Sequence, residues 1–376
     1  MSNIQCHKKC FLQNLFYCNF ENLNVEMNNS LRYSCQVKLP DFGQNSQDKL
    51  KNARVLVVGA GGLGCPALQY LAAIGIGKLG IADFDLVSLS NLHRQILYTP
   101  EEIGQYKAKI AQTKLQAQNP DIQIIAIVEK ITSRNIFTIL ENYDLVLDGT
   151  DNFETRYLLN DACFLQKKPL VYGAIYQYEG QVAVWNVQRE DGTFSPNYRD
   201  VFPDVDASQV PNCSEGGVIP TIAGIIGCMQ ANEVVKYFTK TGELLAGKML
   251  MLDALTLQSR IIKIGSVTNV NIEKIIESID IQLLTMSDFL KTKEKYHLVD
   301  VREEKERLDF NIGGEHIPLQ KLEEQLPFLY NEKPILFYCA SGKRSAEAVK
   351  KYLKSGVGKA AFSLQGGVNG FDKNFD

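Results

Sequence analysis

The chain has 376 residues, 45% of them hydrophobic and 22% charged, a composition typical of globular proteins and enough for more than one hydrophobic core. Its 40 basic and 43 acidic residues give a net charge of −3, and the absence of a dense basic run argues against nucleic acid as the main partner. No apolar stretch is long and charge-free enough to span a bilayer.

Residues 1–30 are expected to form a disordered extension. They contain cysteine, asparagine and aromatic residues but no glycine or proline, and their apolar residues are interrupted too often for a signal-peptide core. A short helix on a membrane surface is the alternative. Recognisable patterning begins at Leu31, which leaves Met27 as a second candidate start of translation.

Strands and helices are predicted to alternate over the next hundred residues. Continuous apolar runs indicate buried parallel strands, and spaced apolar residues indicate helices. The predicted strands are 54–58, 78–82, 122–128 and 144–148, and the predicted helices are 66–74, 107–119 and 135–142. This alternation is typical of a doubly wound, Rossmann-like α/β sheet.

The same sheet is expected to continue in antiparallel fashion and so to be mixed. Two strands around Glu179-Gly180 indicate a hairpin, followed by a long helix over 219–238 and strands at 249–255 and 259–264. We therefore predict a first domain over 31–264 and a linker over 265–280.

A second, small α/β domain is predicted over 281–376. Ser287 is the expected cap of a short helix. Buried strands follow at 296–301 and 334–339, and a glycine closes a helix over 345–356.

The segment Val55–Gly64, VLVVGAGGLG, places four glycines at a strand-to-helix turn. Glycine lets the backbone approach a phosphate, and the N–H groups at a helix start point towards it. Asp83 follows one strand later, where a carboxylate accepts hydrogen bonds from ribose hydroxyls. This pattern alone also fits an NAD-dependent dehydrogenase. The predicted phosphate loop contains Gly59, Gly61, Gly62 and Gly64.

Further polar residues favour a nucleoside triphosphate. Asn91 and Arg94 lie in a polar loop, and Lys107 begins a helix; cations beside a phosphate loop stabilise charge on phosphate oxygens. Asp151 follows an apolar strand, where a carboxylate can hold Mg²⁺. The structural alternative is that the cations form surface ion pairs and that Asp151 caps the next helix.

At these residues the chain resembles the MoeB/ThiF family, relatives of ubiquitin-activating enzymes. The resemblance rests on RYSCQVKLPDFG, VVGAGGLGCPALQYLAAIGIGKLGIADFD, VSLSNLHRQ, DGTDNFETRYLLND and NCSEGGVIP. It implies ATP as cofactor, Mg²⁺ near Asp151, a homodimer, and adenylylation of the C-terminal Gly-Gly of a small ubiquitin-like sulfur carrier of the MoaD/ThiS type. The residues implied to contact ATP are Gly62, Asp83, Ser90, Asn91, Leu92, His93, Arg94, Lys107, Asp151 and Asn152.

The chain departs from the family pattern at two places. Cys35 stands where the family usually has an arginine that reaches into the partner subunit's ATP site, although Arg32 is retained. The family's structural zinc usually rests on two CxxC pairs. Here Asn197 and Asp200 replace the first pair, and the stretch that follows Arg260 in this domain has no cysteine for the second. We therefore expect no zinc.

The nine cysteines form no CxxC pair and suggest neither a disulfide framework nor a zinc knuckle, which fits a reducing cytoplasm. Cys213 lies in a glycine-rich loop before a helix, where the thiolate is stabilised, and it matches a family cysteine proposed to bond to the carrier. The alternative is a small residue filling a turn. Cys65, Cys163 and Cys228 are expected in the core.

Cys339 ends an apolar strand and begins a loop that suits a persulfide. Successive backbone N–H groups in such a loop can surround a thiolate, and basic residues add positive charge. Arg344 lies five positions after Cys339, one residue closer than in cysteine phosphatases, so the loop is too short for phosphate and favours sulfur. The predicted persulfide loop contains Cys339, Ala340, Ser341, Gly342, Lys343, Arg344 and Ser345.

The segment from about Leu284 to Phe375 resembles a rhodanese domain through LVDVRE, GGEHIPL, CASGKRS and LQGGVNGF. Ala340 and Asn311 stand where arginine and histidine are common. Asp300 and Arg302 are expected to form a buried ion pair that braces the loop.

Together these features predict an adenylyltransferase and sulfurtransferase. Arg94, Lys107 and Asp151 would act in adenylylation, and Cys339, with Cys213, would deliver sulfur to form a thiocarboxylate for molybdopterin or thiamine synthesis. The sulfur would come from a persulfide donor such as a cysteine desulfurase. The alternative, kept open by Cys35, is a weak or inactive module that binds the carrier without adenylylating it.

Overall fold

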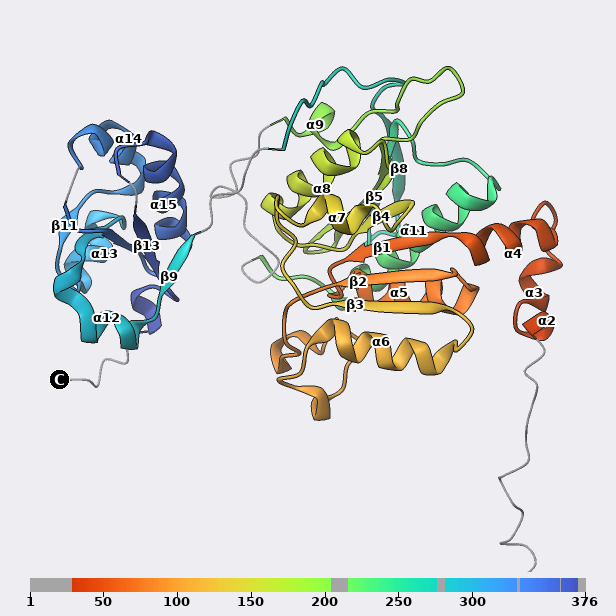
Figure 1. The fold of residues 1–376 in the computed structure, drawn as a ribbon, viewed down its shortest axis with the longest axis horizontal. Helices are drawn as coiled ribbons and strands as arrows, with labels where there is room; N and C mark the ends of the chain where they lie inside the picture. The colour runs from red at the N-terminus through yellow and green to blue at the C-terminus, as the bar shows by residue number, and fades with distance from the viewer. Residues whose placement is uncertain (1–28, 204–215, 276–280, 330–331, 359, 371–376) are drawn as a thin grey trace, which may run out of the picture.

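The computed structural model describes residues 29–203, 216–275, 281–329, 332–358 and 360–370. They form two α/β units, each with its own sheet (Figure 1). Most of the extension predicted over 1–30 lies outside the described residues.

The larger unit contains an eight-stranded mixed sheet in the order β3-β2-β1-β4-β5-β6-β7-β8. The strands from β3 to β5 run parallel, and β6, β7 and β8 continue antiparallel. Because β1 has β2 on one side and β4 on the other, the strand order reverses there and opens a crevice at the carboxyl ends. The strands are β1 (Arg54–Val58), β2 (Lys78–Ala82), β3 (Gln123–Ile127), β4 (Leu145–Asp148), β5 (Leu170–Tyr176), β6 (Glu179–Trp185), β7 (Lys248–Asp253) and β8 (Ser259–Lys263).

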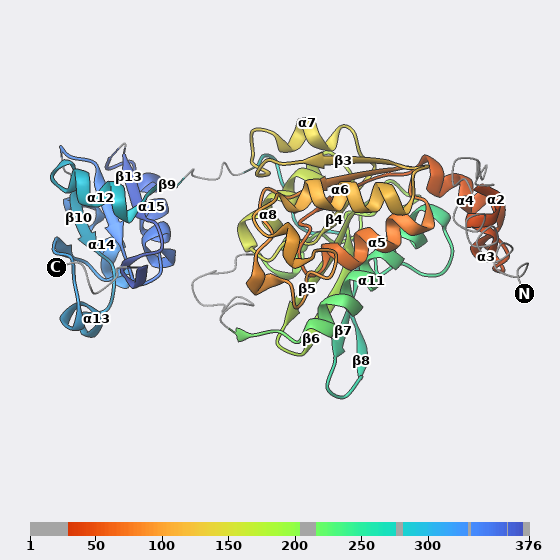
Figure 2. The ribbon, with the colours of Figure 1, turned by 90° about the horizontal axis from the view of Figure 1, so that it is seen from below.

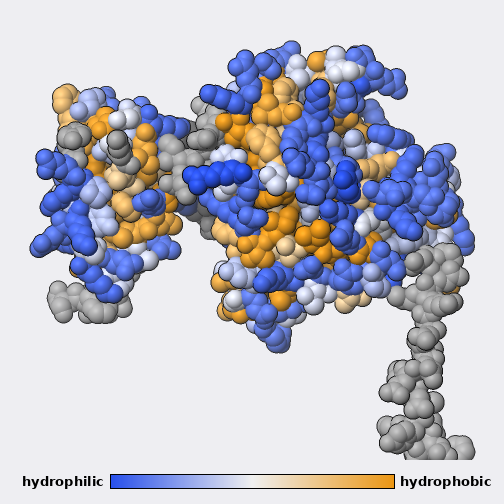
Figure 3. All heavy atoms as spheres, viewed as in Figure 1, coloured by the Kyte–Doolittle hydropathy of each residue, from blue (hydrophilic) through white to orange (hydrophobic). Residues whose placement is uncertain are grey.

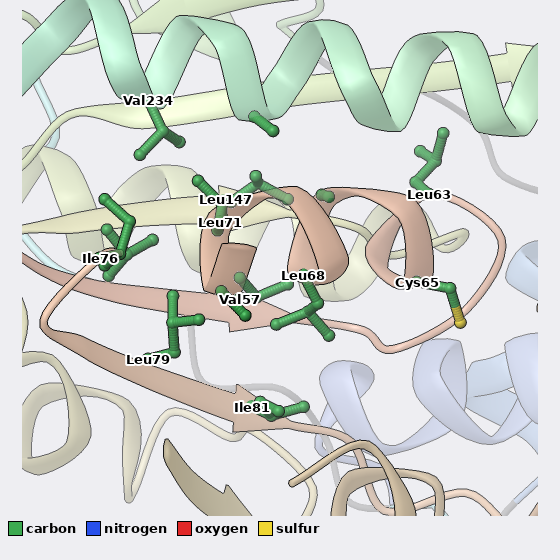
Figure 4. Close-up of a cluster of buried hydrophobic side chains, with 14 of the residues drawn as sticks. Val57, Leu63, Cys65, Leu68, Leu71, Ile76, Leu79, Ile81, Leu147 and Val234 are labelled. Carbon is green, nitrogen blue, oxygen red and sulfur yellow. The ribbon is translucent and has the colours of Figure 1, made fainter. Parts of the chain in front are cut away.

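Helices cover both faces of this sheet, which confirms the doubly wound prediction (Figure 2). On one face α5 packs on β1, and α11 packs against α5 and on β5 and β6. Leu68 and Leu71 of α5, Val234 of α11, Val57 and Leu79 belong to the same buried cluster (Figure 4). On the other face lie α7, α8 and α9. The helices are α2 (Asn29–Arg32), α3 (Ser34–Val37), α4 (Gly43–Asn52), α5 (Gly64–Ile74), α6 (Lys107–Gln118), α7 (Ile136–Leu140), α8 (Phe153–Leu165), α9 (Tyr198–Val201) and α11 (Pro220–Thr239), with 3₁₀ turns η2 (Leu89–Asn91) and η3 (Pro100–Glu102).

The smaller unit has a parallel five-stranded sheet in the order β11-β10-β12-β13-β9, so that β12 is its central strand. Its strands are β9 (Gln282–Leu284), β10 (His297–Asp300), β11 (Glu315–His316), β12 (Ile335–Tyr338) and β13 (Ala361–Leu364). Its helices are α12 (Met286–Thr292), α13 (Glu304–Asp309), α14 (Leu322–Gln325) and α15 (Lys343–Ser355), with 3₁₀ turns η4 (Lys293–Lys295), η5 (Leu319–Lys321), η6 (Leu326–Phe328) and η7 (Val368–Gly370).

Two local predictions are wrong. Thr285, rather than Ser287, caps α12, because its hydroxyl accepts the N–H of Asp288 at 3.1 Å. Glu179-Gly180 belongs to β6 and pairs with Tyr176 and Ile175, so the hairpin turns two residues earlier than expected. Gly180 is needed there for packing, since an added Cβ would lie 2.4 Å from Ile226 of α11.

The surface is mixed in polarity (Figure 3). Hydrophilic residues cover the N-terminal helices at the right, whereas hydrophobic residues are visible across the middle of the larger unit. Among the helices of the described residues, none combines the length and hydropathy needed to cross a bilayer.

Candidate active site

The glycine loop after β1 has a conformation that only glycine tolerates. Gly59 has φ of 91°, and an added Cβ would lie 2.7 Å from the carbonyl oxygen of Gly149. Ala60 fixes the loop from below: its N–H donates to Asp83 Oδ2 at 2.8 Å, and its carbonyl accepts the Tyr98 hydroxyl at 2.9 Å. The sequence analysis missed Tyr98, which no local motif marks.

A cavity of about 1170 Å³ opens beside this loop. Most of the nucleotide-binding residues expected from the sequence line it, from both sides of the crevice between β1 and β4: Gly59, Gly61, Gly62, Asp83, Arg94, Lys107, Asp151 and Asn152. The remaining predicted residues lie outside its wall: Gly64, Ser90, Asn91, Leu92 and His93.

Lys107 and Asp83 form the buried floor of the cavity. Lys107 is only 3% exposed, and its Nζ lies 3.0 Å from Asp85 Oδ2, so its ion pair is not the surface pair of the structural alternative. Burial raises the pKa of the Asp83 carboxyl, although Lys107 and the N–H groups of Ala60 and Asp85 oppose that rise. Lys107 and Asp83 therefore provide a cation and a hydrogen-bond acceptor on the wall of the cavity.

Arg94 is positioned by a short polar chain from η2. Its Nη2 donates to Asn91 Oδ1 at 2.9 Å, and Asn91 in turn donates to the Ser88 hydroxyl at 2.7 Å. Asn91 therefore orients Arg94 without lining the cavity itself.

The carboxylates of Asp148 and Asp151 differ in burial and in hydrogen bonding. Both oxygens of the buried Asp148 are engaged: Oδ1 accepts from Thr150, and Oδ2 lies 3.3 Å from Arg156 Nε. Asp151 is exposed on the cavity wall, and the cap of α8 is Asn152, which accepts the N–H of Thr155 at 2.9 Å. The alternative that Asp151 caps the helix is therefore wrong, and Asp151 is an exposed carboxylate on the cavity wall.

Arg156 was missed by the sequence analysis. It is 7% exposed, donates to the Thr150 carbonyl at 3.1 Å and lies over the Tyr172 ring at 5.0 Å. It holds the loop after β4 in place. One local feature could have indicated its role: Arg156 lies one turn into α8, shortly after a strand that ends in an aspartate.

The Cys339 loop holds its sulfur within the protein. Cys339 is fully buried at the end of β12, the Gly342 N–H donates to its Sγ at 3.1 Å, and the Ser345 hydroxyl lies 3.5 Å from it. Gly342, with φ of 91°, turns the chain into α15. An N–H directed at the sulfur stabilises a thiolate or persulfide, and the Ser345 hydroxyl, which donates to the Gly342 carbonyl at 3.1 Å, helps to fix the loop.

Arg344, at the end of this loop, is paired with a carboxylate. Its Nη1 and Nη2 bind Glu306 Oε2 and Oε1 at 2.7 and 2.6 Å. The predicted Asp300–Arg302 ion pair is confirmed at 2.8 Å, with both side chains buried. Arg302 also donates to the carbonyls of Glu306 and Phe310, so it braces the α13 segment.

The two sites border one cavity. Ser341, Lys343 and Arg344 from the start of α15 line the same cavity as the glycine loop. Lys350 Nζ, about two turns further along α15, lies 3.0 Å from Glu154 Oε2 at the start of α8.

The other cysteines of the described residues differ in exposure. Cys65 and Cys163 are buried as expected, and burial raises the pKa of both thiols, that of Cys65 to about 12. Cys228 is only half-buried and lines an apolar surface groove, so its assignment to the core is wrong. Cys35 is exposed, and Cys213 lies outside the described residues.

Arg32, retained near Cys35, contacts residues that follow α6 or end it in the same chain. Its Nη1 donates to the Gln118 carbonyl at 3.0 Å, and its Nε lies 3.7 Å from Asp121 Oδ2.

The larger unit has a mixed sheet with a glycine loop at its switch point, and in the smaller unit the central strand is followed by a buried cysteine. This combination defines a nucleotide-binding enzyme with a sulfur-transfer domain. The ThiF family model matches residues 33–273, and the rhodanese-like domain model matches residues 285–374. The chain belongs to the ThiF family and carries a rhodanese-like domain.

Several curated proteins are similar to it. It is 39% identical to a probable adenylyltransferase/sulfurtransferase MoeZ of Mycobacterium tuberculosis, over 90% of this chain and 91% of that protein. It is 49% identical to a sulfur carrier protein adenylyltransferase of Thermus thermophilus, over 60% of this chain and 83% of that protein. Identity to the adenylyltransferase and sulfurtransferase MOCS3 of Culex quinquefasciatus is 47%, over 62% of this chain and 53% of that protein.

Solved structures agree on the fold. E. coli MccB, solved with AMPCPP and MccA, superimposes with a TM-score of 0.55 at 22% identity, covering 66% of this chain and 75% of that one. By its family and relatives the chain is an adenylyltransferase and sulfurtransferase.

Proposed function

We propose that this enzyme adenylylates the C-terminal Gly-Gly carboxylate of a small ubiquitin-like sulfur carrier and then replaces the adenylate with sulfur carried on Cys339. The observation that carries this proposal is that the glycine loop and the Cys339 loop border one cavity. An acyl-adenylate formed at one loop lies within reach of the other without leaving the enzyme.

In the first step a carboxylate oxygen of the carrier attacks the α-phosphate of ATP, and pyrophosphate leaves. Lys107 and Arg94, which both line the cavity, stabilise the charge on the phosphate oxygens. Mg²⁺, held by Asp151, would neutralise charge on the leaving pyrophosphate. Asp83 accepts hydrogen bonds from the ribose.

In the second step the Cys339 persulfide attacks the acyl carbon and AMP leaves, which gives an acyl disulfide on Cys339. A thiol then attacks the sulfur of Cys339, and the S–S bond breaks to release the carrier thiocarboxylate. We assign this attack to Cys213, whose disulfide with Cys339 is reduced afterwards by a cellular thiol.

The proposal includes the setting of the reaction. The persulfide donor is a cysteine desulfurase or a similar protein, the compartment is the cytoplasm, and the product serves molybdopterin or thiamine synthesis. The domains are 31–264 and 281–376, joined by the linker 265–280. We assign the apolar groove around Pro66, Ile96, Ile225 and Met229 to a homodimer contact, which Arg94 also borders.

We propose that the enzyme folds without structural zinc, because a polar cluster takes the place of the metal. Asn197 Nδ2 donates to the Thr268 hydroxyl at 2.8 Å, and that hydroxyl donates to Asp200 Oδ2 at 2.7 Å. The backbone N–H of Asn269 donates to Asp200 Oδ1 at 2.8 Å. An amide, a carboxylate and a hydroxyl already paired to one another lack the thiolate and imidazole ligands that zinc prefers.

Metal analysis and a chelator test this assignment. Purified enzyme is expected to contain less than about 0.1 zinc per chain, and EDTA is expected to leave its unfolding temperature unchanged. Thr268→Val should cost about 1–3 kcal/mol, because it leaves the buried Asn197 amide without its acceptor. Stoichiometric zinc would overturn the proposal.

The alternative of a weak or inactive carrier-binding module rests on Cys35. The relatives are named as adenylyltransferases, and they give this alternative no support.

ATP–pyrophosphate exchange in the presence of a carrier ending in Gly-Gly tests the adenylylation step. The wild-type enzyme is expected to catalyse carrier-dependent exchange, and Asp151→Asn is expected to lower its kcat by about 10²–10³-fold. Glu141→Gln removes an exposed carboxylate remote from the cavity and is the matched control. Undiminished exchange in the Asp151 variant would refute the nucleotide assignment, and absent exchange in the wild type would favour the inactive module.

A further inference from the structure

The arginine of the persulfide loop is already neutralised by a carboxylate of the same domain. Arg344 and Glu306 form a two-point ion pair across 38 residues of sequence, with both side chains about one-third exposed. Two parallel N–H···O bonds between a guanidinium and a carboxylate fix both groups in one plane. A molecule that donates sulfur to this loop therefore meets the Arg344–Glu306 ion pair and not an isolated guanidinium.

Glu306 is held in this position by its surroundings. Its Oε2 also accepts the N–H of Glu303 at 3.0 Å in a capping box at the start of α13. The buried Arg302 donates to the Glu306 carbonyl at 3.2 Å and anchors the segment to Asp300. The hydrogen bonds from Arg344 lower the pKa of Glu306 to about 2, so the carboxylate is ionised at neutral pH.

This arrangement bears directly on the reacting sulfur. Arg344 lies in the first turn of α15, two residues after Gly342, whose N–H donates to Cys339 Sγ at 3.1 Å. Glu347, one turn further along α15, places a carboxylate on the wall of the cavity that Arg344 also lines. Lys343 is the other basic residue of the loop, and Ala340 brings no charge.

We propose that Glu306 is a specificity-determining residue that makes the Cys339 loop accept sulfur from a persulfide on another thiol and discriminate against a small dianionic donor such as thiosulfate. The inference rests on the proposed sulfur-transfer function. Thiosulfate must bring a sulfonate to the loop and release sulfite there, so two negative charges develop beside Glu306. A persulfide donor R–S–SH brings no sulfonate to the loop and releases a thiolate with a single charge.

Both reactions balance without an added oxidant. With a persulfide, the Cys339 thiolate attacks the outer sulfur of R–S–SH, the donor S–S bond breaks, and R–S⁻ leaves with the electron pair. With thiosulfate, the same thiolate attacks the sulfane sulfur, and sulfite leaves as a dianion. Only the second leaving group places a dianion beside the Arg344–Glu306 pair.

The experiment compares two donors on the full-length enzyme and on Glu306→Gln. Gln keeps a carbonyl oxygen for the Glu303 N–H but removes the charge. The kcat/KM for thiosulfate, with cyanide as acceptor, is expected to rise on the order of tenfold, as the loss of one unit of like charge at a partly exposed site allows. The rate at which glutathione persulfide loads Cys339, followed by mass spectrometry, is expected to change less than about twofold.

Glu304→Gln is the matched control, because Glu304 is an exposed carboxylate on the same helix. It is expected to change neither rate. An equal change with both donors in Glu306→Gln would show a structural role only and would overturn the inference, as would an unchanged thiosulfate rate.

The wild-type enzyme supplies a second measurement that needs no variant. If Glu306 opposes the dianion, added salt screens the repulsion and raises kcat/KM for thiosulfate. A rate that falls with salt would mean that the loop attracts the dianion, which contradicts the proposal. Failure of both donors to load wild-type Cys339 would overturn the sulfur-transfer function itself, whereas loading without an effect of Glu306→Gln would overturn this inference alone.

Discussion

The glycine loop after β1 and the cysteine loop after β12 use the same backbone device for different chemistry. Each follows a buried parallel strand, turns at a glycine with φ of 91° and leads into a helix, α5 or α15. The first loop contributes only backbone, and its cations, Lys107 and Arg94, come from later segments. The second loop contains its own nucleophile and carries a cation neutralised by Glu306. The glycine loop, which would hold a diffusing nucleotide, is open to the cavity, whereas the Cys339 loop surrounds its own sulfur.

The largest effect is expected from a substitution that removes sulfur loading and leaves adenylylation intact. Cys339→Ser should abolish loading of sulfur by at least about 10³-fold, because the attacking thiolate is lost, while carrier-dependent ATP–pyrophosphate exchange stays within about twofold of wild type. Mass spectrometry and exchange on the same preparation measure both quantities. A parallel loss of exchange would show that the loops are not chemically separate.

The two turning glycines should differ in their tolerance of alanine. At Gly59 an added Cβ meets the Gly149 carbonyl at 2.7 Å, so Gly59→Ala combines backbone overlap with strain and should cost about 3 kcal/mol or more. At Gly342 the nearest atom is 3.3 Å away, so strain dominates and the cost should be about 1–2 kcal/mol. Denaturant unfolding of the two variants tests the order, and a larger cost at Gly342 would contradict it.

Acid should act in opposite directions on the two sites. Burial raises the pKa of Asp83 above 3.8, so its protonation favours the folded state, and its contribution to stability grows as the pH falls through its folded pKa and levels off below 3.8. Glu306 has a pKa lowered to about 2, so its stabilising contribution is present above about 4.5 and is lost as the pH falls towards 2.

Unfolding of Asp83→Asn and Glu306→Gln between pH 6 and 2.5, compared with wild type, measures these contributions. The wild-type advantage over Glu306→Gln should shrink on acidification, and that over Asp83→Asn should not. The reverse pattern would refute both assignments.

The smallest effect is expected at the contact between the two units. Lys350 and Glu154 are 3.0 Å apart and partly exposed, and such pairs contribute about 0.2–1 kcal/mol. Lys350→Glu and Glu154→Lys should each slow single-turnover transfer of sulfur from Cys339 to the adenylylated carrier, by about two- to fivefold, and the exchanged pair should restore the rate. Lys351→Glu is the control, since Lys351 pairs with Glu323 inside its own domain. No rescue by the exchanged pair would show that the contact does not guide transfer.

The sequence revealed the features that are local along the chain. Apolar runs ending in glycine predicted β1 with its observed bounds, and the length of the Cys339 loop pointed to sulfur. Errors arose where neighbouring residues compete for one local role, as with Thr285 and Ser287 at the cap of α12. Periodicity also misplaced Cys228, because an apolar helix face looks the same whether it is covered or open to a groove.

By itself the sequence determined two α/β domains, a phosphate loop and a reactive cysteine, because each is written in residues a few positions apart. Only the tertiary structure decided which charges meet. Arg344 pairs with Glu306, which is 38 residues away in the sequence. Thr268 donates to Asp200 over a separation of 68 residues, and Lys350 pairs with Glu154 over a separation of 196 residues. Such pairs depend on which strand lies beside which, and strand order leaves no period or spacing in the chain.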